Sequence, residues 1–390
     1  MRRREDVKTH PPFFLPAVVL LVCLCSLPSL LGEDGAPSDA PRIVPTKDGA
    51  RLRVETIVTG LEVPWSIAFS SPRRMLVTER PGRVRVVEDG VLRSAPLATI
   101  ADVESTGETG LMGLALAPDY ASSRLLYLSY AYRGASPRVR VEQYRDEGTR
   151  IVRTRTILDG LPAAQFHAGC RLRFGPDGKL YVTTGDATDR ALAQKMDSLA
   201  GKTLRLNPDG SIPPDNPFPG SPIFSLGHRN SQGLDWQTGS GLQFQTEHGP
   251  SGFDGPGGGD EVNIVEAGKN YGWPIIHHRQ TRPGLVSPLL EFTPAIAPSG
   301  ASFARGRALA SFAGDFFFAA LRGERLVRVR FAPQDPRRVA FVEDLFSGEY
   351  GRLREVMSGP DGALYVSTSN RDGRGRVRNK DDRILRISEP

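Results

Sequence analysis

Five of the six histidines lie between residues 167 and 278, in the most polar part of the chain. His167 precedes the run "LRFGPDGKLYVTTGD" (172–186), which ends in Asp186. A neutral imidazole can accept a proton near neutral pH, and a neighbouring carboxylate orients the ring and raises its basicity. If the run folds as a hairpin, it predicts a general base paired with a carboxylate. A structural histidine beside a turn aspartate is the alternative.

A second polar group lies in "GHRNSQG" (227–233), where Arg229, Asn230 and Gln232 follow one another between glycines. A planar guanidinium with two amides suits a ligand that carries carboxylates or a quinone. The alternative is a loop arginine that satisfies local carbonyl groups.

The stretch "HGPSGFDGPGGGDE" (248–261) is the metal candidate. Calcium prefers oxygen ligands, including backbone carbonyl groups. The spacing matches no EF-hand, the histidines lack the spacing of a zinc site, and phosphate-binding loops and GxSxG elbows are absent. The oxygen donors available here are the carbonyl groups of Gly249 and Pro250, the carboxylates of Asp260 and Glu261, and Tyr271.

These loops need a rigid scaffold, and the chain from about residue 50 onward is predicted to form many short strands bounded by Gly, Pro, Asp and Asn. One short helical patch is expected at 189–202. The unit "FGPDGKLYVTTGD" (174–186) recurs as "SGPDGALYVSTSN" (358–370), and Pro-Asp-Gly is a tight-turn sequence. Repeated strand–turn–strand units favour an all-β, six-bladed β-propeller, with about six blades of four strands in the available length. A large β-sandwich or jelly roll is the alternative.

The N-terminus is basic, then apolar, then small and polar, which is typical of a secretory signal peptide. We expect a signal peptide or membrane anchor at 1–32, a flexible linker at 33–49 and a single propeller domain at 50–390. The protein would be exported, to a bacterial periplasm. After cleavage Cys170 would be the only thiol, so no internal disulfide is expected.

The net charge of +6 comes from scattered arginines, which argues against nucleic-acid binding.

Several motifs, taken in order from about residue 52 to 388, resemble the soluble, pyrroloquinoline-quinone-dependent sugar dehydrogenases of the glucose/sorbosone dehydrogenase family, with the aldose sugar dehydrogenases most similar. The motifs are "VPWSIAF", "GETGLMGLALAPDY", "FHAGCRLRFGPDGKLYVTTGD", "GKTLRLNPDGSIPPDNPF", "SLGHRNSQGLDW", "EHGP…GGDEVN…GKNYGWP" and "RLREVMSGPDGALYV".

The resemblance implies oxidation of the C1 hydroxyl of an aldose to a lactone. His167 would be the general base, supported by Asp186, while hydride passes to the quinone and Arg229 stabilises the developing charge. Calcium and pyrroloquinoline quinone would be the cofactors, and an external acceptor would take the electrons. The implied cofactor contacts are Glu108, Arg229, Asn230, Gln232, Arg322, Arg352 and Arg354. The implied calcium ligands are Gly249 and Pro250 at the cofactor, and Glu261 and Tyr271 at a structural site.

The sequence departs from the family pattern at three places. Arg322 stands where the family usually has Lys, which changes donor geometry. Glu108 stands where some members have Gln, and an anion beside an anionic cofactor is costly unless it is protonated or paired. The link at 251–260 is several residues longer than usual.

Two other functions stay open at this point: a non-catalytic propeller that binds a partner, and a calcium-dependent sugar lactonase. The sequence names neither the sugar, nor the electron acceptor, nor the oligomeric state.

Overall fold

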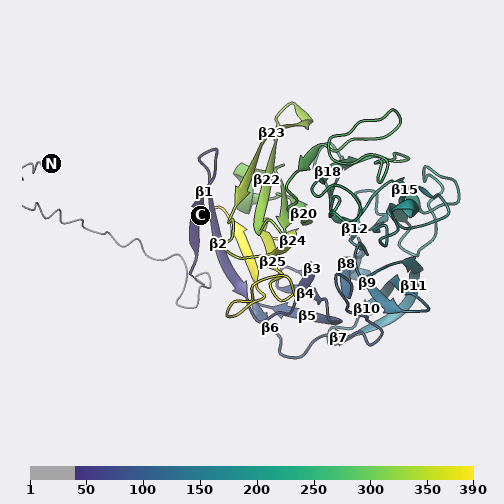
Figure 1. Cartoon of the computed structure of the whole chain (residues 1–390). Coiled ribbons are helices and arrows are strands. Elements are labelled where there is room, and N and C mark those ends of the chain that lie inside the picture. Colours follow the sequence, from purple (N-terminus) through teal and green to yellow (C-terminus); the bar gives the residue numbers. More distant parts are fainter. Residues whose placement is uncertain (1–39) are drawn as a thin grey trace, which may run out of the picture.

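The computed structural model describes residues 40–390, and the expected signal peptide or anchor lies outside this range. Six antiparallel sheets are arranged around a central axis as the blades of a β-propeller (Figure 1). The innermost strands of neighbouring blades contact one another in a closed ring, β3–β8–β12–β16–β20–β24 and back to β3. The expected six-bladed all-β fold is therefore confirmed.

The first three blades run in chain order from the innermost strand outward. Blade one contains β3 (Pro64–Ser71), β4 (Arg74–Glu79), β5 (Arg83–Glu88), β6 (Val91–Leu92) and β7 (Ala98–Thr99). Blade two contains β8 (Leu111–Leu116), β9 (Leu125–Arg133), β10 (Pro137–Asp146) and β11 (Ile151–Pro162), with α1 (Tyr120–Ser123) between its first two strands. Blade three contains β12 (Leu172–Phe174), β13 (Leu180–Thr183), β14 (Lys202–Leu206) and β15 (Ile223–Leu226).

The last three blades complete the ring. Blade four contains β16 (Ser231–Trp236), β17 (Gln243–Glu247), β18 (Asp260–Val265) and β19 (Leu290–Phe292). Blade five contains β20 (Pro298–Phe303), β21 (Phe316–Ala320), β22 (Arg325–Ala332) and β23 (Asp335–Leu345), with η2 (Arg307–Phe312) after its first strand. Blade six contains β24 (Leu353–Ser358), β25 (Leu364–Thr368) and β26 (Ile384–Ser388), followed by β2 (Arg51–Val58) and β1 (Arg42–Pro45).

Blade six joins the two ends of the described chain. Strand β2 pairs with β26, with Arg53 opposite Ser388, and β1 adds an outermost strand. This pairing ties the start of the described chain to its end and so closes the ring of blades. Residues 42–45, which the sequence assigned to a flexible linker, form a strand of this sheet.

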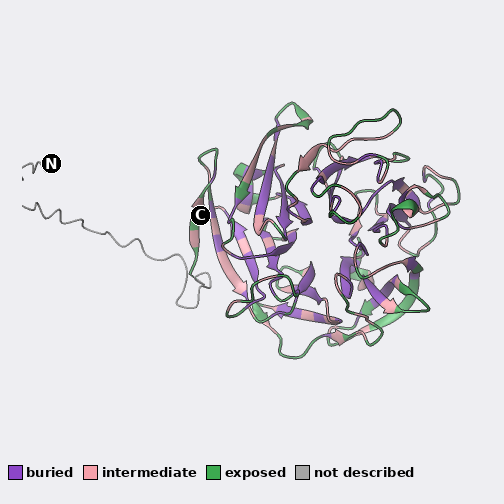
Figure 2. Cartoon of the chain, in the orientation of Figure 1, coloured by how far each residue is buried: buried purple, intermediate pink, exposed green. Residues whose placement is uncertain are grey.

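Burial follows the position of each strand in its blade (Figure 2). All six residues of the innermost strand β20 are buried, whereas most residues of the outermost strand β11 are exposed. Strand β5 alternates between partly exposed arginines and fully buried valines, the period of two that a half-buried strand requires. Apolar clusters fill the space between neighbouring blades, as where Phe244 of blade four packs on Phe303 of blade five.

The repeated Pro-Asp-Gly units form the turns between the first and second strands of blades three and six, as the sequence predicted. The expected helix at 189–202 is much shorter, a single 3₁₀ turn η1 (Arg190–Gln194). Its end is fixed by tertiary contacts, because Lys202 reaches back to donate hydrogen bonds to the carbonyl groups of Leu192 and Ala193. Among residues 40–390, no helix has the length and apolar character needed to cross a membrane.

Candidate active site

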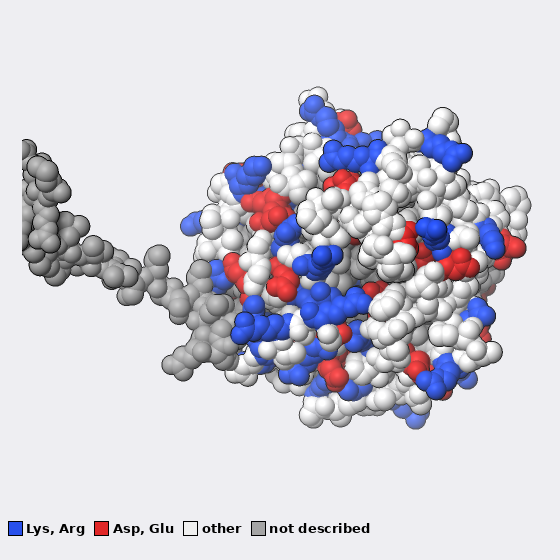
Figure 3. Space-filling view, in the orientation of Figure 1, with Lys and Arg blue, Asp and Glu red and all other residues white. Residues whose placement is uncertain are grey.

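A cavity of about 340 Å³ opens at the centre of one face of the propeller. Strands alternate in direction, so the loops that enter each innermost strand and the loops between second and third strands meet at this face. The lining includes six arginines and three carboxylates, which makes the cavity electropositive, and Figure 3 shows basic side chains gathered near the middle of this face. The charged lining residues are Arg80, Arg229, Arg322, Arg352, Arg354, Arg374, Glu108, Asp260 and Asp372.

His167 and Asp186 form a buried pair beside this cavity. The ring Nδ1 of His167 lies 2.8 Å from Oδ1 of Asp186, and the two residues are 4% and 1% exposed. The backbone N–H of Thr188 donates to Oδ1 of Asp186, and the indole N–H of Trp273 donates to Oδ2, each at 2.8 Å. With both oxygens of Asp186 occupied, the carboxylate is fixed and the imidazole is held in one orientation.

The local backbone explains why the two residues meet. His167 has φ of +57°, in the left-handed region that residues with a side chain rarely adopt. Its carbonyl oxygen lies so close to Gly185 that a Cβ there would be 1.8 Å away, so only glycine fits. The hairpin of β12 and β13 thus returns directly under the loop that carries His167 and brings Asp186 to the ring.

Arg229 is buried and lines the cavity, at 2% exposure. Its Nε donates to Oδ2 of Asp254 at 2.7 Å, its Nη1 to the carbonyl oxygen of His248 at 3.2 Å, and its Nη2 to Oγ of Ser251 at 3.0 Å. Every nitrogen of the guanidinium therefore has a partner in the segment that follows β17. The predicted Arg229 thus lies at the cavity, and its anchoring by Asp254 was not foreseen from the sequence.

Gln232 lines the cavity beside the predicted Asn230. The side-chain amide of Gln232 donates to the carbonyl oxygen of Gly169 and to Oδ1 of Asn230, each at 3.3 Å. The same oxygen of Asn230 accepts the backbone N–H of Gly169 at 3.2 Å. The two amides thus hold the loop between His167 and β12.

Glu108 enters the cavity as a paired carboxylate. Its Oε1 accepts a hydrogen bond from Arg374 at 3.0 Å, and its Oε2 accepts the backbone N–H of His167 at 3.3 Å. Burial opposes its ionisation, but the charges of His248 and Arg374 lower its pKa below the usual range. A carboxylate at this position was expected to be protonated or paired, and Arg374 pairs with Glu108.

Three predicted arginines reach the cavity from blades five and six. Arg354 is 4% exposed and donates to Oε1 of Gln232 at 3.3 Å, and burial lowers the pKa of its guanidinium to about 10. Arg352 donates to Asp372 at 2.8 Å. Arg322 is exposed at the rim between β21 and β22. Arg322 and Arg354 therefore offer positive charge to a ligand, whereas the charge of Arg352 is paired with Asp372.

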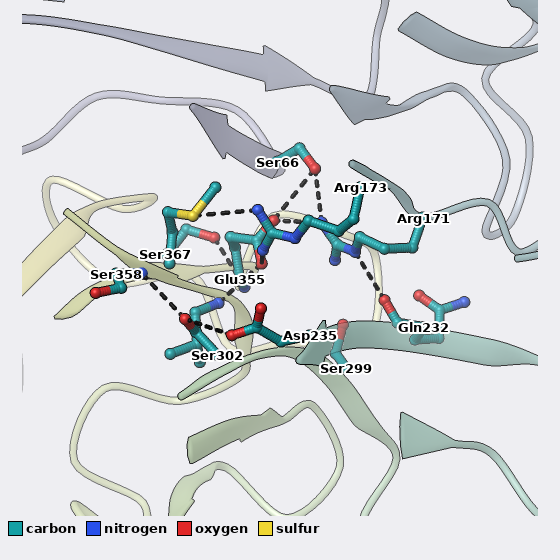
Figure 4. A network of polar contacts seen from close by, with 12 residues as sticks. Ser66, Arg171, Arg173, Gln232, Asp235, Ser299, Ser302, Glu355, Ser358 and Ser367 are labelled. Carbon is teal, nitrogen blue, oxygen red and sulfur yellow. Dashed lines mark hydrogen bonds and ion pairs between the residues drawn. The ribbon is translucent and has the colours of Figure 1, made fainter. Parts of the chain in front are cut away.

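A network of buried polar contacts lies beneath the cavity, between the innermost strands of the blades (Figure 4). Arg171 donates through Nε to the carbonyl oxygen of Gln232 at 2.9 Å, and through Nη1 to Glu355 and to Ser66. Arg171 and Glu355 are fully buried, and the guanidinium lies 4.2 Å from the ring of Trp65. The pair supports Gln232 from below, and Glu355 directly follows Arg354 in β24.

The loop after β17 brings Gly249 to the cavity wall. The N–H of Gly249 donates to Asp260 at 2.8 Å, and a Cβ at this position would lie 2.2 Å from the carbonyl oxygen of Gly259. Pro250 accepts a hydrogen bond from the N–H of Gly258 at 3.1 Å through its carbonyl oxygen. These contacts close the base of the long segment at 251–257.

Glu261 and Tyr271 lie away from the cavity, in blade four. Burial and the nearby carboxylate of Glu247 raise the pKa of Glu261 well above its usual range. The hydroxyl of Tyr271 donates to the carbonyl oxygen of Ile264 at 2.6 Å and accepts from the N–H of Glu266 at 2.9 Å. Tyr271 can thus offer its backbone oxygen rather than its phenol to a cation.

Sequence reasoning missed several residues that line the cavity or hold those that do. Trp273 lies in the quoted motif "GKNYGWP", but its indole contact with Asp186 depends on a fold-back of 87 residues. The ring Nε2 of the cavity residue His248 is buried with no hydrogen-bond partner in the protein. The other missed residues are Arg80, Asp254, Asp372 and Arg374.

Comparison with known proteins agrees with this geometry. The family model for glucose / sorbosone dehydrogenase matches residues 61–385. The aldose sugar dehydrogenase YliI of Escherichia coli (strain K12) is 32% identical over 349 residues, covering 83% of this chain and 92% of its own. A solved oxidoreductase of Thermus thermophilus is 46% identical with a TM-score of 0.80, over 86% of this chain and 99% of its own. The quinone-bound aldose sugar dehydrogenase of Streptomyces coelicolor is 35% identical with a TM-score of 0.77, over 90% of this chain and 99% of its own.

The fold and site together define a six-bladed propeller with a buried histidine–carboxylate pair at an arginine-rich central cavity. The chain belongs to the glucose/sorbosone dehydrogenase family, and the resemblance drawn from its motifs is confirmed. Its similar structures include a pyrroloquinoline-quinone-bound aldose sugar dehydrogenase and a soluble aldose sugar dehydrogenase, so the chain is grouped with these enzymes.

Proposed function

We propose that the protein oxidises the C1 hydroxyl of aldose sugars to lactones, with pyrroloquinoline quinone and calcium as cofactors. The observation that carries this proposal is the buried His167–Asp186 pair placed beside a cavity lined by six arginines. Enclosed cavities of about 300–1,000 Å³ are typical of small-molecule sites.

The cavity residues fit an anionic quinone. Arg354 is nearly buried and is hydrogen-bonded only to neutral side chains, and a buried cation favours a negatively charged partner. The buried Nε2 of His248 has no partner within the protein, which favours a polar ligand group at this wall. Arg322 at the rim keeps the positive charge that the family usually supplies with Lys, although its donors are arranged differently.

His167 would act as the general base. With its Nδ1–H donated to Asp186, its Nε2 is free to accept the proton of the C1 hydroxyl, and Asp186 stabilises the resulting imidazolium. Arg229 places a fixed positive charge at the cavity, where negative charge develops during the oxidation. When bound, the quinone supplies the hydride acceptor and calcium supplies Lewis acidity.

Calcium has two proposed positions. Gly249 and Pro250 would offer backbone oxygens beside the cofactor, as the family pattern implies. Glu261 and Tyr271 would hold a structural ion, and the position of Glu261 directly opposite Glu247 in neighbouring strands supports this, because a divalent cation offsets the repulsion between two adjacent carboxylates.

We also propose that the protein is exported to the periplasm through residues 1–32 and passes its electrons to an external acceptor. The basic and apolar pattern of the N-terminus supports export.

Reconstitution tests the function. The chain without residues 1–39 is purified, loaded with calcium and pyrroloquinoline quinone, and assayed on a panel of aldoses with an electron-accepting dye. We expect turnover that needs both additions, and a calcium-dependent rise in melting temperature that Glu261→Gln reduces. Lactone hydrolysis with calcium alone would support a lactonase instead, and bound quinone without turnover would support a binding module.

His167→Ala tests the base in the same assay. It should bind the quinone normally and lose about 10²- to 10⁴-fold in turnover, the usual contribution of general-base catalysis. His277→Ala is the matched control, because His277 does not line the cavity, and it should retain full turnover. Equal turnover in the two variants would refute the role of His167.

A further inference from the structure

The long segment after β17 carries an aromatic ring to the proposed base. The ring of Phe253 stacks on that of His167, with centroids 5.9 Å apart and planes inclined by 24°. Phe253 is nevertheless 66% exposed. Its apolar surface is therefore open to solvent directly beside the ring that would take the proton of a substrate.

Four polar contacts hold Ser251 and Asp254, the residues on either side of Phe253, in place. Asp254 accepts Nε of Arg229 at 2.7 Å and the backbone N–H of Ser251 at 3.0 Å, and its own carbonyl oxygen accepts Nη1 of Arg190 at 3.0 Å. Oγ of Ser251 accepts Nη2 of Arg229 at 3.0 Å. Burial opposes the ionisation of Asp254, but Arg229 lowers its pKa, so the ion pair is present at neutral pH. The segment is thus fixed to the cavity on both sides.

The placement of Phe253 favours contact with a sugar rather than with the quinone. Phe253 belongs to blade four and faces the base, whereas Arg352 and Arg354, which suit the cofactor's carboxylates, come from blade six. An aldose in its ring form has an apolar face of C–H groups, and aromatic rings pack well against such faces while the hydroxyl groups keep their polar partners.

We propose that Phe253 is a substrate-binding residue, on which the apolar face of an aldopyranose packs while its C1 hydroxyl lies at His167. The ion pair between Asp254 and Arg229 positions this platform. The inference rests on the proposed function and narrows it, because it selects ring-form aldoses over open-chain polyols, which have no comparable face.

The test uses the quinone- and calcium-loaded protein and four forms: wild type, Phe253→Ala, Phe253→Trp and the control Val91→Ala. Val91, in β6 of blade one, is 67% exposed and does not line the cavity. The substrate is the aldohexose with the highest wild-type turnover. The 1,5-anhydro analogue of that sugar, which lacks the C1 hydroxyl, reports binding without reaction by calorimetry.

Phe253→Ala should raise both KM and the Kd of the analogue about tenfold, the loss of one aromatic contact, with kcat within about threefold. Phe253→Trp and Val91→Ala should stay within about threefold of wild type in all three constants. An unchanged Kd in Phe253→Ala would overturn the inference, because the ring would then make no contact with the sugar. A lowered Kd would overturn it as well, because the ring would then obstruct the site. Failure of the proposed function is distinguishable, because wild type itself would then show no turnover.

Discussion

Asp186→Asn changes the proposed base with the smallest change of shape. Oδ1 of Asp186 accepts both His167 and the N–H of Thr188, so the oxygen of the new amide should take this position. The –NH2 group would then face the indole N–H of Trp273, and two donors would meet in a buried site. The variant therefore removes a negative charge and creates one unsatisfied contact, while leaving the ring orientation of His167 intact.

The two losses have different magnitudes and different readouts. A carboxylate about 4 Å from an imidazolium contributes about 4 kcal/mol at an effective dielectric constant of about 20. Since each 1.36 kcal/mol is a factor of ten in rate, turnover should fall about 10³-fold. The opposed donors should lower the free energy of unfolding by about 1–3 kcal/mol.

Turnover is measured with the loaded protein, and unfolding by urea with the cofactor-free protein. Asp177→Asn is the matched control, because Asp177 lies in the same hairpin at the opposite end and does not line the cavity. It should keep wild-type turnover. The double variant Asp186→Asn/Trp273→Phe should lose less stability than the sum of its single changes, because the second change removes the opposed donor, yet its turnover should stay low. Turnover of Asp186→Asn within about threefold of wild type, with the quinone bound, would refute the electrostatic reasoning.

Two further predictions concern the interior. Burial raises the pKa of the Cys170 thiol to about 12, so at about pH 8 the reactive thiolate is scarce. In the chain that begins at residue 40, iodoacetamide should label Cys170 only after addition of denaturant, and rapid labelling of the native protein would contradict its burial. Glu355→Ala leaves the buried guanidinium of Arg171 without its ion pair and should cost about 3–5 kcal/mol in urea unfolding. Replacing both residues by Met should recover most of this loss, and a cost below about 1 kcal/mol in Glu355→Ala would show that the pair is not stabilising.

Local sequence was sufficient for the repeating architecture. Pro-Asp-Gly turns and alternating apolar residues act over a few positions, and they predicted the strand pairs of blades three and six. The pairing of His167 with Asp186 was also accessible, because one hairpin separates the two residues. The prediction of a helix at 189–202 was wrong because the contacts of this segment are not local. Its residues are hydrogen-bonded to loops distant in sequence, and the helix is limited to one 3₁₀ turn.

The amino-acid sequence by itself determined the propeller, the family and the pairing of a histidine with a carboxylate, because these depend on short motifs whose chemistry is local. The tertiary structure decided which charged side chains meet at the cavity. Arg374 neutralises Glu108 across 266 positions, Trp273 fixes Asp186 across 87, and the lengthened segment returns Asp254 to Arg229. Closing six blades in a ring brings loops from every part of the chain to one face, and no local pattern encodes which of their side chains come within hydrogen-bond distance.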